Sequence, residues 1–251
     1  MYDVVIPVKT GEYNQELRYT LRSIEKYASN IRKIWLVGYS PSWVKNVELL
    51  PTSQPLDKWL NTRNNIETAC RCDLISDNFI LFNDDFILTK EIRYWDHFNG
   101  FHRGTLFEAE CKYQHFPDKN IWREGFHFNR QILILAGCGK DNDEPLNYEV
   151  HIPVVFNKEK RLNLFERPEF RKYRNESEPL LFQRSIYFNL YPSVCQKQIN
   201  DCKIFTDIKD LSMFDYGVLS VAQNVIGNRD KAPLLHTWLD STLSNKSYFE
   251  K

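Results

Sequence analysis

Strand-like and helix-like segments alternate through the first ninety residues, and this alternation constrains the fold more than any other feature of the sequence. Asp3–Val8 and Lys33–Val37 are short apolar runs of the kind that buried parallel strands show. Between them, residues 14–29 place apolar side chains at helical spacing and charged side chains on the other faces. This order is typical of an α/β domain with a Rossmann-type, mostly parallel central sheet and helices on both faces.

The same alternation continues to residue 90. Ser40-Pro41 has the form of a helix N-cap followed by proline at the first helical position, and Val47–Leu50 can form a third strand. Asp57 can cap a helix that runs to about Cys72, and the apolar run Phe79–Phe82 predicts the next strand. Farther along, the sequence predicts a helix over 129–136, a strand over 148–156, a helix over 178–191 and a short strand at 203–205.

Length, charge and cysteine content narrow the class of protein. A chain of 251 residues suffices for one large domain, and 33 basic against 33 acidic residues leave no net charge to attract nucleic acid or a membrane surface. No apolar run approaches the roughly eighteen residues of a membrane span, and the N-terminus has no signal-peptide pattern. We therefore expect a soluble, cytoplasmic protein whose six cysteines, none in C-x-x-C spacing, are free thiols.

Two adjacent carboxylates, Asp84 and Asp85, stand between two apolar segments within Asn78–Leu88. A charge in such surroundings needs a partner, and oxygen ligands at a strand end suit Mg²⁺ or Mn²⁺ holding a pyrophosphate. We therefore expect Asp84 and Asp85 to bind one of these ions. A plain turn is the alternative, because Asn and Asp are favoured turn residues.

Three other titratable residues are candidates for chemistry. In the predicted strand over 148–156, Glu149 and His151 fall on one face, where either could act as an acid or a base; a structural use is the alternative. His151 is the better candidate for proton transfer because imidazole titrates near neutral pH. His236, near the C-terminus, could add a nitrogen ligand to Mn²⁺.

The first ninety residues resemble the nucleotide-sugar transferases of the GT-A fold. Their first strand often ends with a run like Val5–Val8, and their Asp-x-Asp metal motif follows an apolar strand, as Asn83-Asp84-Asp85 does here. The resemblance implies that Asp85, the last acid of the motif, binds the metal ion. It also implies that the earlier positions, Asn83 among them, face the ribose or the sugar of the donor.

A longer similarity is to the Stealth family, whose members transfer a hexose-1-phosphate from a nucleotide sugar. His151-Ile-Pro153 resembles the third signature region of that family, whereas Ile6–Gly11 replaces its acid-bearing first signature, and we find no clear acidic final signature after residue 200. These departures favour transfer of the sugar itself. The segments similar to the second signature region are Glu16–Tyr27, Ile31–Val37, Pro41–Trp43, Asn65–Glu67 and Phe82–Asp85.

Taken with the resemblance, the residues predict a single domain over 1–251 that acts as a metal-dependent glycosyltransferase. Residues 1–90 would bind the nucleotide sugar, a UDP-sugar by preference, and residues 91–251 an acceptor hydroxyl on a glycan, a small molecule or a hydroxylated DNA base. Sugar-1-phosphate transfer and non-catalytic binding of carbohydrate or nucleotide are the alternatives. Asp84, Glu149 and His151 would serve catalysis. Donor contacts are expected from Pro7, Val8 and Lys9 near the base, from Lys58 and Arg63 near the phosphates, and from Asn64 and Asn83.

Overall fold

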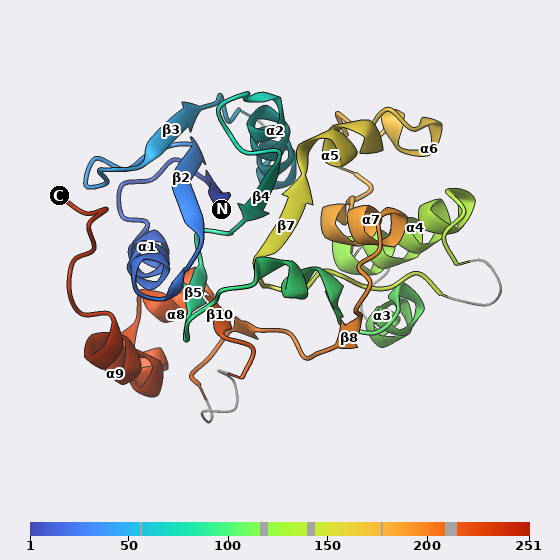
Figure 1. Ribbon diagram of the computed structural model, residues 1–251. Coiled ribbons are helices and arrows are strands. Elements are labelled where there is room, and N and C mark those ends of the chain that lie inside the picture. Colours follow the sequence, from blue (N-terminus) through green and yellow to red (C-terminus); the bar gives the residue numbers. More distant parts are fainter. Residues whose placement is uncertain (56, 116–119, 140–143, 177, 209–214) are drawn as a thin grey trace.

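The computed structural model describes residues 1–55, 57–115, 120–139, 144–176, 178–208 and 215–251. Its centre is a five-stranded sheet (Figure 1). The first four strands along the chain run parallel, and the last runs antiparallel to its neighbour. In spatial order the strands are β3 (Glu48–Pro51), β2 (Ile31–Gly38), β1 (Tyr2–Val8), β4 (Asn78–Leu81) and β7 (Val154–Asn157).

Two long helices cover opposite faces of this sheet, as Figure 1 shows. They are α1 (Gln15–Tyr27) and α2 (Lys58–Arg71). Asp57 caps α2 through its side-chain oxygen, which accepts hydrogen bonds from the backbone N–H groups of Trp59 and Leu60 at 2.8 and 3.2 Å. The predicted α/β class, with a mostly parallel central sheet, is confirmed.

Pro7 lies in β1, an inner strand, although proline has no N–H to donate to a neighbouring strand. On one side β1 pairs with β2 along its whole length, but on the other side β4 pairs only with Asp3 to Val5. The N–H of Phe82 then donates to the carbonyl of Val5 at 2.9 Å, and the chain turns away. Pro7 therefore stands where the sheet has already ended on the β4 side.

The second half of the chain completes the sheets that the first half begins. A three-stranded sheet contains β5 (Phe86–Leu88), β10 (Val218–Val221) and β9 (Lys203–Ile204); β10 pairs antiparallel with β5 and parallel with β9. A small parallel pair joins β6 (Phe101–His102) to β8 (Lys197–Gln198). Because β7 joins the central sheet and β10 joins β5, residues 1–90 and 91–251 are interleaved.

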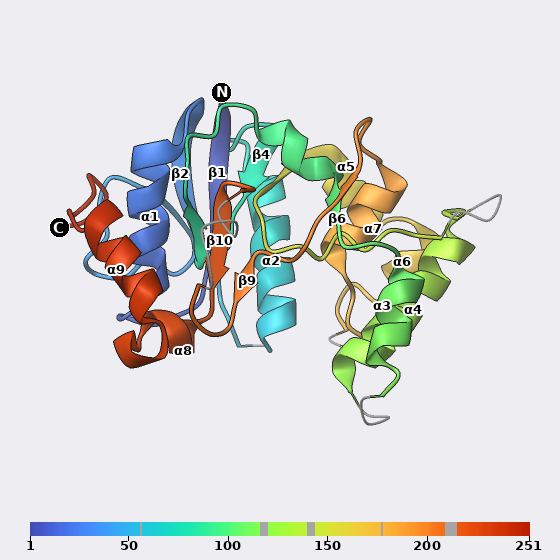
Figure 2. The same ribbon diagram turned by 90° about the horizontal axis from the view of Figure 1, so that it is seen from below.

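The remaining helices gather in two places. One group lies beside β7, at the right of Figure 2, and contains α3, α4, α6 and α7; the other, with α8 and α9, lies near α1. No helix among the described residues is both long enough and apolar enough to span a bilayer. The bounds of all the remaining helices are η1 (Trp95–Gly100), α3 (Leu106–Tyr113), α4 (Ile121–Leu135), α5 (Lys158–Leu164), α6 (Pro168–Arg171), α7 (Gln183–Leu190), α8 (Gln223–Ile226), η4 (Arg229–Lys231) and α9 (Pro233–Thr242).

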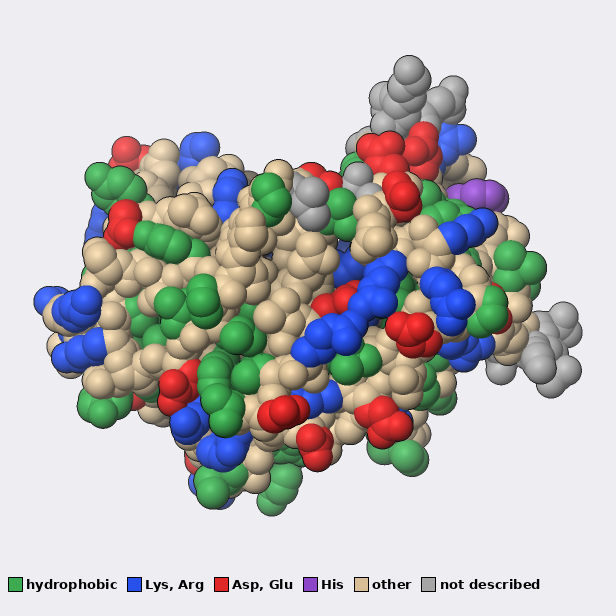
Figure 3. All heavy atoms as spheres, turned by 90° about the horizontal axis from the view of Figure 1, so that it is seen from above, with side chains coloured by type: hydrophobic (Ala, Val, Ile, Leu, Met, Phe, Trp, Pro, Cys, Tyr) green, Lys and Arg blue, Asp and Glu red, His purple; other side chains and the backbone are tan. Residues whose placement is uncertain are grey.

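Basic and acidic side chains are interspersed on the face of the molecule in Figure 3. A short band of Lys and Arg side chains crosses the middle of this face, and acidic side chains lie directly beside it. Among the described residues, this face therefore has no broad field of one charge sign, in keeping with the zero net charge of the chain.

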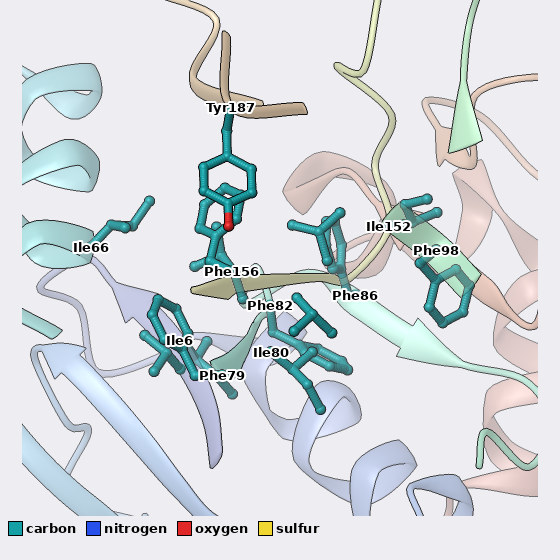
Figure 4. Close-up of a cluster of buried hydrophobic side chains, with 14 of the residues drawn as sticks. Ile6, Ile66, Phe79, Ile80, Phe82, Phe86, Phe98, Ile152, Phe156 and Tyr187 are labelled. Carbon is teal, nitrogen blue, oxygen red and sulfur yellow. The ribbon is translucent and has the colours of Figure 1, made fainter. Parts of the chain in front are cut away.

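Aromatic side chains form much of the main core (Figure 4). Phe79 of β4 and Phe156 of β7 meet edge to face, with ring centroids 6.3 Å apart, and Phe82 and Phe86 flank the turn between β4 and β5. All four side chains are fully buried. At roughly 1.5–3 kcal/mol for each large apolar side chain, this cluster fixes the end of β4 and the start of β5 rigidly.

One predicted helix is absent from the described structure, and one predicted strand is shorter than expected. Residues 40–45 form a turn instead of a helix, in which Ser42 donates through its backbone N–H and its hydroxyl to Glu12. Residues 148–153 are irregular, and the strand begins at Val154, because the guanidinium of Arg184 takes the carbonyls of Val150 and Ile152 that a sheet would need. All six cysteines are free thiols, as predicted.

Candidate active site

Asp84 and Asp85 lie in a tight turn between β4 and β5, which we call the acid turn (Asn83–Phe86). The N–H of Phe86 donates to the carbonyl of Asn83 at 3.3 Å, and the hydroxyl of Thr20 on α1 donates to the carbonyl of Asp84 at 2.7 Å. The turn follows the carboxyl end of β4, and β1 and β2 end at the same edge of the sheet. The motif is thus a turn in its backbone, and it also presents two carboxylates where ligands of parallel sheets bind.

Asp85 is held by two residues from the second half of the chain. One of its oxygens, Oδ2, pairs with the ammonium of Lys203 and accepts a hydrogen bond from the hydroxyl of Ser220 at 2.8 Å. The other oxygen, Oδ1, is buried and has no hydrogen-bond partner among the described residues. A buried carboxylate oxygen without a partner is costly, and a bound cation would supply that partner.

Negative charge is concentrated around the acid turn. Burial, together with the charges of Asp85 and Glu16, raises the pKa of Asp84 to about 7. Burial and the charge of Asp85 also raise the pKa of Glu16, in the first turn of α1. Three carboxylates therefore interact with one another beside the ammonium of Lys203. A bound cation would relieve the repulsion among them.

The chain does not enclose a metal ion by itself, since the described residues contain no cluster of three or more His, Cys, Asp or Glu side chains able to hold one. Mg²⁺ in nucleotide-dependent enzymes is commonly bound by one or two carboxylates, water and the phosphates of the substrate. The unpartnered Oδ1 of Asp85 and the excess of carboxylates fit a site of that kind.

His151 is oriented by a carboxylate that the sequence analysis did not single out. Asp201 accepts hydrogen bonds from the backbone N–H of His151 at 3.1 Å and from its ring Nδ1 at 2.9 Å, and Arg103 donates to the same carboxylate at 3.0 Å. Although burial alone would raise it, the pKa of Asp201 is lowered by the hydrogen bond from His151 and by the charges of His151 and Arg103. An ionised Asp201 must accept, so Nδ1 of His151 carries the proton and Nε2 remains free to accept one.

Glu149 has a structural contact. Its Oε1 accepts hydrogen bonds from the backbone N–H and the hydroxyl of Ser185, at 3.0 and 3.3 Å, in the first turn of α7. Such a carboxylate satisfies a free N–H and interacts favourably with the positive end of the helix. Because residues 148–153 are not a strand, the prediction that Glu149 and His151 share a strand face is wrong.

Arg184 connects these groups. Its guanidinium is buried, donates to the carbonyls of Val150 and Ile152, and interacts electrostatically with Glu149, Asp85 and Asp201. Burial lowers its pKa from the ordinary value, and the three carboxylates oppose that shift. The acid turn and the His151 segment are therefore neighbours around one buried cation.

A single short segment also joins the two halves of the site. Asp201 binds His151, and Lys203, two residues farther along, binds Asp85. The carbonyl of Cys202, between them, accepts the N–H of Ser220, which fixes this segment against β10. The structure thus brings together Asp84, Asp85 and His151 of the predicted residues, and adds Asp201, Lys203, Arg184 and Ser220.

The predicted donor contacts are distributed around the carboxyl edge of the central sheet. Val8, buried at the end of β1, offers its carbonyl to the side-chain amide of Gln54 at 2.7 Å. Gly38, at the end of β2, has a φ of 110° and lies so close to Gln54 and Val8 that a side chain there would clash. Pro7, Asn64 and Asn83 are half-buried, whereas Lys9 and Lys58 are exposed. Donor binding by these residues stays a prediction.

Two assignments need correction. Arg63 is fully buried, and its Nη1 donates to the carbonyls of residues 173, 174 and 176 at 2.8, 2.9 and 3.0 Å, so it supports that loop and does not face a donor phosphate. His236 is buried on α9, and its Nε2 lies 3.3 Å from the carbonyl of Val225, a residue of a second hydrophobic cluster. Because the described residues form no three-ligand group, His236 does not join Asp84 and Asp85 around an ion.

Known proteins are similar to the chain in part of their sequence. No family model matches it. The capsular polysaccharide phosphotransferases eps5J and CpsJ of Streptococcus thermophilus are each 26% identical over 136 residues, which take in 42% of this chain and 56% of theirs. The human N-acetylglucosamine-1-phosphotransferase subunits alpha/beta are 32% identical over 110 residues, covering 36% of this chain and 8% of that protein. The chain thus spans about half of the length of the streptococcal relatives that it matches.

Among solved structures, the galactosyltransferase LgtC in complex with donor and acceptor sugar analogs has a TM-score of 0.51 at 11% identity, with 98% of both chains covered. At this identity the likeness concerns the fold alone. The chain therefore has a GT-A-like fold, and its sequence is similar to Stealth-type phosphotransferases, as the sequence analysis indicated.

Proposed function

We propose that this chain is a metal-assisted transferase that takes a sugar from a nucleotide sugar, a UDP-sugar by preference, and transfers it to an acceptor hydroxyl. The observation that carries the proposal is the short segment in which Asp201 binds His151 and Lys203 binds Asp85. It brings a group suited to a diphosphate next to a group suited to deprotonating a hydroxyl.

The acid turn would hold the donor. Asp85, through the unpartnered Oδ1, and Asp84 would bind Mg²⁺ or Mn²⁺ on the diphosphate. Such an ion, when bound, neutralises charge that builds on the leaving phosphate. Asn83, the end of β1 at Pro7 and Val8, and Lys9 directly after it lie along the same edge of the sheet and would contact the nucleoside.

His151 would act on the acceptor. An alcohol hydroxyl is a weak nucleophile, and a base within hydrogen-bond reach makes it a better one. With Nδ1 bound to Asp201, the free Nε2 of His151 can take the hydroxyl proton as the acceptor oxygen forms its new bond. Asp201 stabilises the imidazolium that results, and Arg103 holds Asp201 in place.

Glycosyl transfer is the first candidate because Ile6–Gly11 replaces the acid-bearing first signature of the Stealth family. In that reaction the acceptor oxygen bonds to the anomeric carbon, the bond from this carbon to the phosphate oxygen breaks, and a nucleoside diphosphate leaves.

Transfer of a sugar-1-phosphate is the second candidate, favoured by the names of the sequence relatives, which are phosphotransferases. There the acceptor oxygen bonds to the phosphorus next to the sugar, the P–O–P bridge breaks, and a nucleoside monophosphate leaves.

We infer that the acceptor is a saccharide hydroxyl, bound mainly by residues 91–251. The relatives with capsular polysaccharide in their names support this choice. A hydroxylated DNA base is the weaker candidate, because a chain with no net charge has little electrostatic attraction for the phosphate backbone.

The experiment that tests the proposal incubates the purified chain with UDP-sugars, Mn²⁺ and oligosaccharide acceptors, and separates the nucleotides released. We expect UDP as the product. UMP would establish sugar-phosphate transfer instead. Binding of nucleotide sugar with no product from any donor and acceptor pair would support the non-catalytic alternative.

A further inference from the structure

Lys203 is the cation bound to the acid turn in the described structure. Its ammonium pairs with Oδ2 of Asp85, and the side chains of both residues are only 14% exposed. No other lysine or arginine in the described part of the chain forms an ion pair with Asp84 or Asp85. The pair is therefore shielded from solvent, where charges interact more strongly than on the surface.

The backbone of Lys203 is fixed by the second sheet. Lys203 lies opposite Ser220 in the register of β9 and β10, and the N–H of Val221 donates to the carbonyl of Asp85 at 3.0 Å. The hydroxyl of Ser220 donates to the same carboxylate oxygen that Lys203 binds. The position of the lysine is thus set, whereas its four-carbon side chain lets the ammonium move between partners.

Lys203 and a divalent ion would compete for the same carboxylate. An ion that used Oδ2 of Asp85 would displace the ammonium, and an ion on Oδ1 would stand next to a positive charge. The competition ends when the ammonium gains another anionic partner. A diphosphate held by the ion at the acid turn would supply that partner.

We propose that Lys203 is a resident counter-ion that competes with the divalent ion for Asp85 and moves to the donor diphosphate when ion and donor bind together. Lys203 thereby makes ion binding depend on the nucleotide, so that each strengthens the binding of the other. This inference rests on the proposed function for the identity of the donor. The competition between Lys203 and the ion does not depend on turnover.

The test measures Mn²⁺ affinity from the electron paramagnetic resonance signal of free Mn²⁺, in wild type, Lys203→Met and Lys203→Arg, with and without UDP. Without UDP, we expect Lys203→Met to bind Mn²⁺ at least tenfold more tightly than wild type, and Lys203→Arg to resemble wild type. The gain in Mn²⁺ affinity that UDP gives wild type should be largely lost in Lys203→Met. Equal or weaker Mn²⁺ binding by folded Lys203→Met would overturn the inference.

A matched control is Lys33→Met, which removes a lysine that pairs with Glu48 at 2.7 Å on the far edge of the central sheet. It should leave Mn²⁺ affinity unchanged.

A second measurement needs no variant: in wild type with ¹⁵N-labelled lysine, Mg²⁺ with UDP should shift the Nζ resonance of Lys203. An unshifted resonance at concentrations that saturate binding would overturn the inference, as would equal or weaker Mn²⁺ binding by Lys203→Met.

The two proposals can fail separately. If the wild type transfers a sugar while Lys203→Met leaves Mn²⁺ affinity unchanged, the counter-ion inference is wrong and the proposed function stands. If Lys203→Met tightens Mn²⁺ binding and the wild type turns over no donor, the counter-ion inference stands and the proposed function is wrong.

Discussion

Asp201 accepts hydrogen bonds from two groups of His151, the backbone N–H at 3.1 Å and the ring Nδ1 at 2.9 and 3.0 Å. The contact with the backbone N–H holds the His151 backbone against Asp201, and the contact with the ring fixes which ring nitrogen carries the proton. An imidazole with both constraints presents Nε2 in one direction, which is what a base for a hydroxyl requires.

Asp201→Asn is expected to lower kcat by about 10²-fold or more, because an amide can stabilise the wrong tautomer of His151 and cannot stabilise an imidazolium. KM for the donor should change little, since the hydrogen bonds of Asp201 are made with His151 and Arg103 and not with the acid turn. The measurement is the pH profile of kcat, whose limb on the acid side should move or disappear. Asp240→Asn, which removes a carboxylate paired with Arg229 on the surface, is the matched control and should leave the profile intact.

Asp84→Asn and Asp85→Asn should differ in stability although both should abolish turnover. Asp85→Asn breaks the partly buried pair with Lys203, and we expect a loss of about 1–3 kcal/mol in the free energy of unfolding. Asp84→Asn removes a carboxylate whose pKa is raised to about 7, which means that its ionised form destabilises the folded state. At pH 8 and with chelator present, we therefore expect the free energy of unfolding to rise by about 1 kcal/mol. Thermal melts of the two variants in EDTA make the comparison, and full activity in either would remove that residue from the metal site.

The sequence was most informative where structure depends on local pattern. The helices α1 and α2 follow from apolar spacing and from the cap at Asp57, and the acid turn stands out because charge interrupts an apolar run. Asp201 could not be singled out in this way, since its partner His151 lies 50 residues away. The one available signal was the alternation of Asp201 and Lys203 around Cys202, typical of a short strand with two polar residues on one face.

Two residues were misassigned because residue type was weighed above position. Arg63 has Ile66 and Cys70 at spacings of three and seven along α2, which places it on the inner face of the helix. His236 likewise has Leu239 three residues later, on the buried side of α9. A charged or titratable residue at an apolar helical spacing is best assigned to the core first.

Arg63→Met should therefore destabilise the chain without a specific effect on donor binding. It removes three hydrogen bonds to the carbonyls of residues 173, 174 and 176 inside the protein, and we expect a loss of about 3 kcal/mol in the free energy of unfolding. Denaturant melts give the stability, and KM for the donor at a temperature where the variant is folded gives the function. A large rise in KM with an unchanged melt would return Arg63 to the donor site.

Glu250 should make stability depend on pH in the acid range. It is buried and accepts from Arg18 at 2.9 Å and Arg22 at 2.7 Å, which ties the C-terminal segment to α1. Although burial would raise it, the pKa of Glu250 is lowered to about 2 by hydrogen bonds from Arg22 and from the N–H of Ser247 and by the charge of Arg22.

A lowered folded-state pKa means that the unfolded chain binds the proton first as pH falls. The stabilisation from Glu250 is therefore fully present above the ordinary glutamate pKa of 4.5 and is lost as pH falls from there to about 2. Glu250→Gln should reduce the free energy of unfolding at pH 7 by about 2 kcal/mol, less than for a fully buried pair because both arginines are partly exposed. Its unfolding free energy should fall less steeply than that of wild type between pH 4.5 and 2. Parallel pH profiles for the two proteins, from urea melts at each pH, would show that the contact between the C-terminal segment and α1 contributes no pH-dependent stability.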